Sequence, residues 1–150
     1  MLTNKAKYAL RAMIDLAAHS GPDRPVMIGV IAKRQDIPRR FLENILLELR
    51  NEGMVVSYRG KAGGYALAHD ADEISFADII RVIDGHLAMA PCASRTAYQR
   101  CDDCKNEATC ALRRTLMEAR DAVAEVLENT TLADAMASVK RKRKTATTPA

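Results

Sequence analysis

The most constraining feature of this 150-residue chain is a succession of helices and breaks in its first third. Apolar residues recur at helical spacing from Thr3 until Gly21-Pro22, which predicts a first helix of about four turns. A short helix is expected over residues 28–35. The break Asp36-Ile-Pro38 follows, and the proline suits the first turn of a longer, amphipathic helix that Gly53 ends.

Two short strands are expected next, over residues 54–58 and 64–68. They are joined by the glycine-rich tip Arg59-Gly-Lys-Ala-Gly-Gly64, which carries two cations. A short helix, a tight break, a longer helix and a hairpin are together typical of a winged helix-turn-helix, whereas the helices alone would also fit a generic packed pair.

The second half begins with Ser75-Phe-Ala-Asp78, a capping-box pattern that opens a helix ending at Gly85. Beyond Cys110, apolar residues recur at alternating steps of four and three, which indicates a helix that packs against another helix. Those residues are Leu112, Leu116, Ala119, Val123 and Val126. Thr131-Leu-Ala-Asp134 is a second capping box, from which a last short helix is expected to run to about Val139.

Charge divides the chain into three regions. Residues 1–70 carry 11 Lys and Arg against 7 Asp and Glu, residues 71–139 carry 7 against 12, and residues 140–150 carry 5 against none. We therefore expect a DNA-binding region over 1–70, a cysteine loop with dimerisation helices over 71–139, and a disordered basic tail over 140–150. The tail fits nonspecific DNA attraction and plain solubility equally well.

Cellular location and reaction class are also constrained. The N-terminus lacks the apolar core of a secretion signal, and no apolar run approaches the roughly 18 residues that span a bilayer. We expect a cytoplasmic protein with reduced thiols and no membrane partner. No nucleotide-binding glycine loop or catalytic triad is present, so neither an enzyme nor a small-molecule substrate is expected.

The second predicted helix of the helix-turn-helix has the residues that base reading requires. Arg39 and Arg40 lie near its N-terminus, and Glu43 lies one turn further on. Arginine can bond guanine O6 and N7 as a fork, while glutamate can accept from cytosine N4. Taken singly, such residues are ordinary surface charges, but within this pattern they predict binding to a double-stranded DNA operator.

The wing completes the predicted DNA-binding set. Arg59 and Gly60 form its tip, where the arginine could enter a narrow minor groove. Lys61 and Lys5 are expected to meet phosphates, which adds affinity without reading sequence.

These segments together resemble a known family, the winged-helix regulators that include the iron-sulfur assembly regulator and the nitric-oxide-sensing repressor. The resemblance spans about residues 1–135, and its most diagnostic motif is the wing, Tyr58-Arg-Gly-Lys-Ala-Gly-Gly-Tyr-Ala-Leu67. It implies a homodimer on a near-palindromic operator, joined by a long helix near residues 110–127. The expected fold is thus mainly α with a small β-hairpin, a winged helix-turn-helix plus a long C-terminal dimerisation helix.

All four cysteines lie within one polar stretch, Cys92, Cys101, Cys104 and Cys110. Because this stretch has no apolar period, a metal or cluster is expected to organise it, and an iron-sulfur cluster of the 2Fe-2S or 4Fe-4S type is favoured. Zinc is less favoured, although the Cys101-x-x-Cys104 pair would suit a closed structural site. Cluster-free thiol switching is the third reading.

The resemblance implies three cysteine ligands, which Cys92, Cys104 and Cys110 match. In the assembly regulator a histidine three residues after the last cysteine is the fourth ligand, and Arg113 stands there in this chain. In the nitric-oxide sensor the fourth ligand is an aspartate of the other subunit, at a place held here by Lys7. Cys101 is extra, and we expect it to replace both. The sequence therefore predicts a DNA-binding transcriptional regulator, and specifically a repressor, whose operator affinity is controlled by the iron-sulfur cluster. The signal that acts on the cluster is left open among iron, nitric oxide, oxygen and redox state.

Overall fold

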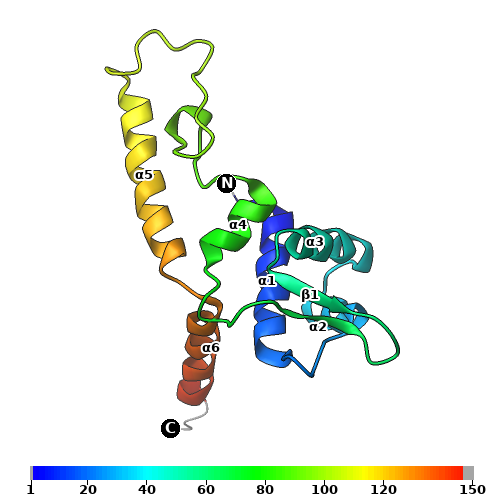
Figure 1. Cartoon of the computed structure of the whole chain (residues 1–150). Coiled ribbons are helices and arrows are strands. Elements are labelled where there is room, and N and C mark those ends of the chain that lie inside the picture. The colour runs from blue at the N-terminus through cyan, green and yellow to red at the C-terminus, as the bar shows by residue number, and fades with distance from the viewer. Residues whose placement is uncertain (1, 147–150) are drawn as a thin grey trace.

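The computed structural model describes the backbone of residues 2–146 and the side chains of residues 2–141. In this part of the chain the elements follow the order α1, α2, α3, β1, β2, α4, η1, α5, α6, with one short 3-10 helix, η1 (Figure 1). The expected fold class is confirmed, because the molecule is mainly helical and carries one two-stranded hairpin.

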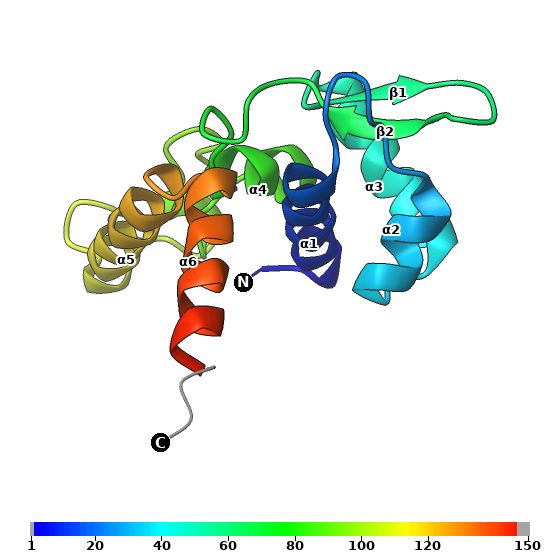
Figure 2. The same cartoon turned by 90° about the horizontal axis from the view of Figure 1, so that it is seen from below.

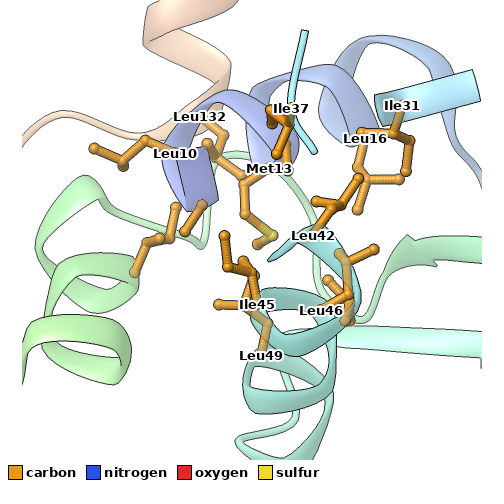
Figure 3. Packing of buried hydrophobic residues seen from close by; sticks show 14 of the residues in the cluster. Leu10, Met13, Leu16, Ile31, Ile37, Leu42, Ile45, Leu46, Leu49 and Leu132 are labelled. Atoms are coloured by element: carbon orange, nitrogen blue, oxygen red, sulfur yellow. The ribbon is translucent and has the colours of Figure 1, made fainter. Parts of the chain in front are cut away.

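Helix α1 (Asn4–His19) is the centre of the fold. Thr3 caps it as expected, because its hydroxyl accepts the Ala6 N–H at 3.1 Å. The helix contacts α2, α3, α4, α6 and β2, so its buried residues occupy the middle of the core (Figures 2 and 3). Met13 and Leu16 are fully buried there beside Leu42 and Ile45 of α3.

The helix-turn-helix is formed by α2 (Ile28–Gln35) and α3 (Arg39–Asn51). Asp36 turns the chain between them in the left-handed conformation with φ 52°, which aspartate tolerates better than most residues. Pro38 stands immediately before α3 instead of inside its first turn.

A buried carboxylate holds α2 against α1. Asp15 is 1% exposed, and its oxygens lie 2.8 Å from Arg34 Nε and 2.9 Å from Gln35 Nε2. Burial of a charged group is favourable only when its hydrogen bonds are satisfied, and α2 supplies both partners. The angle between the two helices is therefore set partly by polar contacts.

The wing consists of β1 (Val55–Tyr58) and β2 (Gly64–Leu67), paired antiparallel with Val55 opposite Leu67. The hairpin is attached to the segment before α2 because Tyr65 of β2 pairs with Val26 in an isolated β-bridge. A Cβ on Gly64 would lie 2.4 Å from the Val26 carbonyl oxygen, so this close approach requires glycine.

Helix α4 (Phe76–Asp84) begins with the expected capping box of Ser75 and Asp78. It packs on α1 and α3 and lies between them and α5 (Ala111–Glu128). Residues 85–110 connect α4 to α5 and contain η1 (Pro91–Ala93). Figure 1 shows this connection at the far end of α5, away from the hairpin. No helix within residues 2–146 is long and apolar enough to cross a bilayer.

The last helix corrects one expectation. Helix α6 (Leu132–Ala146) does not end near Val139 but continues through the basic run, so residues 140–146 are helical instead of disordered. Lysine and arginine are good helix formers, and extending an existing helix avoids the cost of nucleating one. The rest of the expected tail, residues 147–150, lies outside the described residues.

Candidate DNA-binding surface and cysteine segment

The N-terminus of α3 presents the three predicted base-reading residues to solvent. The helix buries Leu42, Ile45, Leu46 and Leu49 against the core, which leaves Arg39, Arg40 and Glu43 on its outer side. Arg39 Nε lies 3.2 Å from Glu43 Oε1, and their side chains are 67% and 50% exposed. An exposed i, i+4 ion pair contributes only about 0.3–0.5 kcal/mol, so DNA could replace it.

The wing tip carries two cations that have no ion-pair partner in the part of the chain that the structure describes. Arg59 and Lys61 are exposed and form no ion pair with any described residue. Gly60 between them has φ 101°, and its carbonyl accepts the Gly63 N–H at 3.0 Å, which closes the turn. The tip thus offers two uncompensated positive charges on a tight loop.

Lys5 is placed differently from the other predicted DNA contacts. Its Nζ lies 2.6 Å from Glu48 Oε1, which joins α1 to α3. Each side chain is partly exposed, at 33% and 40%. Because Glu48 already balances its charge, Lys5 can meet a phosphate only after that ion pair opens. The sequence pattern contained no signal for this pairing.

The four cysteines lie in the connection between α4 and α5, which we call the cysteine segment (residues 92–110). All four are free thiols; Cys92 is buried, and Cys101, Cys104 and Cys110 are half-buried. Cys110 also caps α5, because its sulfur accepts the Arg113 N–H at 3.4 Å. The segment therefore begins within η1 and ends at the cap residue that precedes the long helix.

Arg113, which stands at the position of the assembly regulator's histidine, links α5 to the cysteine segment. Its Nε donates to the Cys92 carbonyl at 3.0 Å, and its guanidinium lies 5.9 Å from the centre of the Tyr98 ring. The Tyr98 hydroxyl in turn donates to the Glu107 carboxylate, a bond that raises the pKa of Tyr98. Sequence reasoning treated Arg113 only as an absent ligand and missed this role.

The thiols are partly gathered. A hydrogen bond with Cys92 raises the pKa of the Cys101 thiol, and weaker contributions come from burial and nearby charges. The Cys104 N–H bonds the Cys101 carbonyl at 3.1 Å. Among the described residues, however, no three His, Cys, Asp or Glu side chains lie close enough to hold a metal ion. Four thiols suit an iron-sulfur cluster or zinc chemically, but the segment would have to close around it.

The apolar seam expected on α5 faces outward from this chain. Leu112 is 68% exposed and Val126 is 64% exposed. Arg120 is the one buried residue of α5. A helix of this length with an uncovered apolar face has the surface required for packing against another helix.

Comparison with known proteins agrees with this arrangement. The Rrf2 family, described as iron-dependent transcriptional regulators, matches residues 2–138. The chain is 43% identical over 140 residues to an rrf2-like HTH-type transcriptional regulator of Rhodobacter capsulatus, covering 92% of this chain and 93% of that protein. It is 38% identical to the HTH-type transcriptional regulator IscR of Yersinia enterocolitica, with 89% of this chain and 77% of that protein covered.

A solved structure described as CymR (YrzC), the global cysteine regulator of B. subtilis, is also similar. It superposes with a TM-score of 0.75 at 33% identity, covering 92% of this chain and 97% of that one. Members of this family are DNA-binding transcriptional regulators and not enzymes. The family match spans the helix-turn-helix, the wing and the long helix that follows the cysteine segment. The chain belongs to the Rrf2 family of transcriptional regulators.

Proposed function

We propose that this protein is a homodimeric repressor that binds a double-stranded DNA operator, and that an iron-sulfur cluster in its cysteine segment controls its operator affinity. The observation that carries the proposal is the position of the four thiols. They fill the connection between α4, which packs on the DNA-binding half, and α5, whose apolar seam faces outward.

Base reading is assigned to the N-terminus of α3 and the wing. Arg40 would bond base edges directly, while Arg39 and Glu43 would exchange their mutual ion pair for contacts with guanine and cytosine. Arg59 would enter the minor groove, and Lys61 would meet a phosphate. Lys5 contributes to DNA binding only if its bond to Glu48 opens.

Two copies would associate through the α5 seam. Leu112, Val123 and Val126 would then be covered by the same residues of the second copy, as in a self-complementary two-fold interface. Such a dimer sets the separation of the two α3 helices, which must match half-sites about one DNA turn apart.

Cys92, Cys101, Cys104 and Cys110 would hold the cluster. A bound cluster supplies a redox-active centre whose ligation depends on deprotonated thiols. Cys110 is the residue that caps α5, so ligation there would replace its bond with the Arg113 N–H. Affinity for DNA changes only if the cluster-bound and cluster-free forms of the cysteine segment favour different dimer geometries. The segment meets the proposed dimer helix at the α5 cap, so a change of ligation there would act on that geometry.

A cluster-free thiol switch is the second candidate. It is favoured because all four thiols are free and lie in one segment, where two of them could form a disulfide under oxidation. The similar structure described as a global cysteine regulator is consistent with this reading. A zinc-stabilised regulator, held by the Cys101-x-x-Cys104 pair and its neighbours, is the third.

Anaerobic purification with quantification of iron, sulfide and zinc separates these candidates. Iron with equal sulfide and a visible absorption band supports the cluster, and Cys101→Ala should then lose iron, whereas Thr109→Ala, at an exposed position of the same segment, should retain it. An operator selected from random DNA should bind holo and apo protein with dissociation constants that differ by about fivefold or more. Equal constants contradict cluster control. A colourless protein with stoichiometric zinc, or with a DNA affinity that follows only the thiol oxidation state, selects the corresponding alternative.

A further inference from the structure

The outward side of α3 has a central line of residues that are mostly uncharged. The buried side chains of the helix point into the core (Figure 3), namely Leu42, Ile45, Leu46 and Leu49. Successive residues of an α-helix are about 100° apart, so the position of each outer residue relative to this buried stripe follows from its number. Within about 30° of the direction opposite the stripe lie Arg40, Asn44, Leu47 and Asn51. A duplex that meets the outer side of α3 therefore faces these side chains most directly.

Asn44 and Leu47 lie together in an open hollow of about 360 Å³ on this side of α3. The other residues that line it are Lys5, Phe41, Glu48 and Asn51. Leu47 is 45% exposed although it is large and apolar, and the Asn44 side-chain amide bonds no other group among the described residues. Lys5 and Glu48 balance one another at 2.6 Å. The hollow thus presents an unpaired neutral amide beside an apolar side chain.

This pair of side chains matches the major-groove edge of A·T base pairs. Adenine presents an N7 acceptor and an N6 donor, and one asparagine side chain can bond both of them. Thymine adds a 5-methyl group, which is favourably covered by an apolar side chain. Guanine has two acceptors on the same edge and cytosine has no methyl group, so a G·C pair satisfies neither side chain as well.

We propose that Asn44 reads an adenine in each half-site of the operator, and that Leu47 packs against the 5-methyl group of a thymine next to it. The inference rests on the DNA binding proposed for α3, and it adds A·T recognition to the contacts with guanine and cytosine. Asn44 follows Arg40 by about 6 Å along the helix, and base pairs are about 3.4 Å apart. The adenine should therefore lie within about two base pairs of the guanine that Arg40 contacts.

The test starts from a duplex that the native chain selects from random DNA. Each A·T pair of one half-site is replaced in turn by G·C, and fluorescence anisotropy measures the dissociation constant. We expect one pair whose replacement weakens binding about tenfold or more, because a bidentate contact is lost. At that pair, 7-deazaadenine lacks only the N7 acceptor and should weaken binding about two- to tenfold. Deoxyuridine in place of the neighbouring thymine lacks only the methyl group and should weaken binding about threefold.

Three variants assign these losses to side chains. Asn44→Ala should bind the adenine and 7-deazaadenine duplexes equally, and Leu47→Ala should bind the thymine and uracil duplexes equally. Both residues are exposed, so neither substitution removes a core contact, and alanine favours the helix. Asn51→Ala is the matched control, because it changes the same residue type on the same side at the last residue of α3. It should keep both losses, since the N-terminal part of a recognition helix reads base edges.

The contrary outcomes are separable. The role of Asn44 is overturned if no A·T pair of the half-site matters, or if Asn44→Ala still distinguishes adenine from 7-deazaadenine. The role of Leu47 is overturned if Leu47→Ala still distinguishes thymine from uracil. A native chain that selects no duplex would also contradict the proposed DNA-binding function. Tight binding by the native chain with losses that the variants leave unchanged would contradict only the roles of Asn44 and Leu47.

Discussion

Helices α1 and α5 are similar in length but are held in opposite ways. Seven of the 16 residues of α1 are buried, and six of those seven are apolar. Of the 18 residues of α5 one is buried, and it is Arg120. The helix-turn-helix and the wing are thus attached to an apolar core, whereas α5 and the cysteine segment are held within one chain mainly by hydrogen bonds and ion pairs.

The difference matters for regulation. Apolar packing is dense and resists small displacements, so the helix-turn-helix keeps its shape when conditions change. A segment with few buried apolar contacts opens at a lower free energy than the core does. A cluster or a disulfide would therefore reshape the cysteine segment first. Four experiments test this difference between the apolar core and the cysteine segment.

The largest effect should come from a leucine-to-alanine substitution in the apolar core, compared with the same substitution on α5. Leu46→Ala removes a fully buried side chain and should lower the free energy of unfolding by about 2–5 kcal/mol. Leu112→Ala removes one that is 68% exposed, and should weaken self-association instead. Chemical denaturation of dilute protein and sedimentation equilibrium separate the two quantities. An equal loss of stability for dilute Leu112→Ala would disprove the contrast.

The next effect concerns the wing, which belongs to the core-stabilised half. Arg59→Ala should weaken operator binding by about 1–2 kcal/mol without changing stability, because the side chain is exposed and has no partner to lose. Fluorescence anisotropy with a labelled operator measures the dissociation constant. Arg114→Ala on α5 is the control, and a similar loss there would indicate general electrostatic attraction instead of a wing contact.

Arg113→Ala tests the polar half. It removes the bond to the Cys92 carbonyl and the contact with the Tyr98 ring, together worth about 1 kcal/mol. Amide hydrogen exchange should quicken across residues 92–110 of the metal-free protein and stay unchanged in α1 and α3. Exchange that quickens equally in both halves would show that the two regions unfold together.

The smallest effect should be a pH dependence at the start of α6. Hydrogen bonds from the backbone and side chain of Thr131 hold the pKa of Asp134 below its usual value of 3.8. A lowered pKa stabilises the folded state above 3.8, and that contribution disappears as the pH falls through the folded value. The protection factors of the first-turn amides of α6, which correct for the intrinsic pH dependence of exchange, should therefore fall in acid. Asp134→Asn should remove this pH dependence, and an unchanged profile would refute it.

Much of the fold was predictable because its signals are local. Thr3, the Ser75 and Thr131 capping boxes, the break before α3 and the glycine-rich wing tip each specify a backbone event within a few residues. The end of α6 was predicted wrongly for the same reason. A run of basic residues indicates disorder by composition, yet it continues a helix when one already precedes it.

The candidate sites were less predictable because they depend on distant residues. Lys5 and Glu48 are 43 positions apart, and Arg113 reaches the Cys92 carbonyl across 21 positions. No local pattern reveals such pairs. The same applies to Asp15, whose partners on α2 become visible only after the two helices pack.

Local sequence signals specify most of the helices and strands and identify candidate residues for the chemistry, since periodicity, caps and clustered thiols act over short distances. Which charges are already paired depends instead on contacts between residues far apart in the chain. That is why Arg59 differs from Lys5, whose charge Glu48 balances. Ion pairs and cavities arise from packing between elements, and packing has no period along the chain.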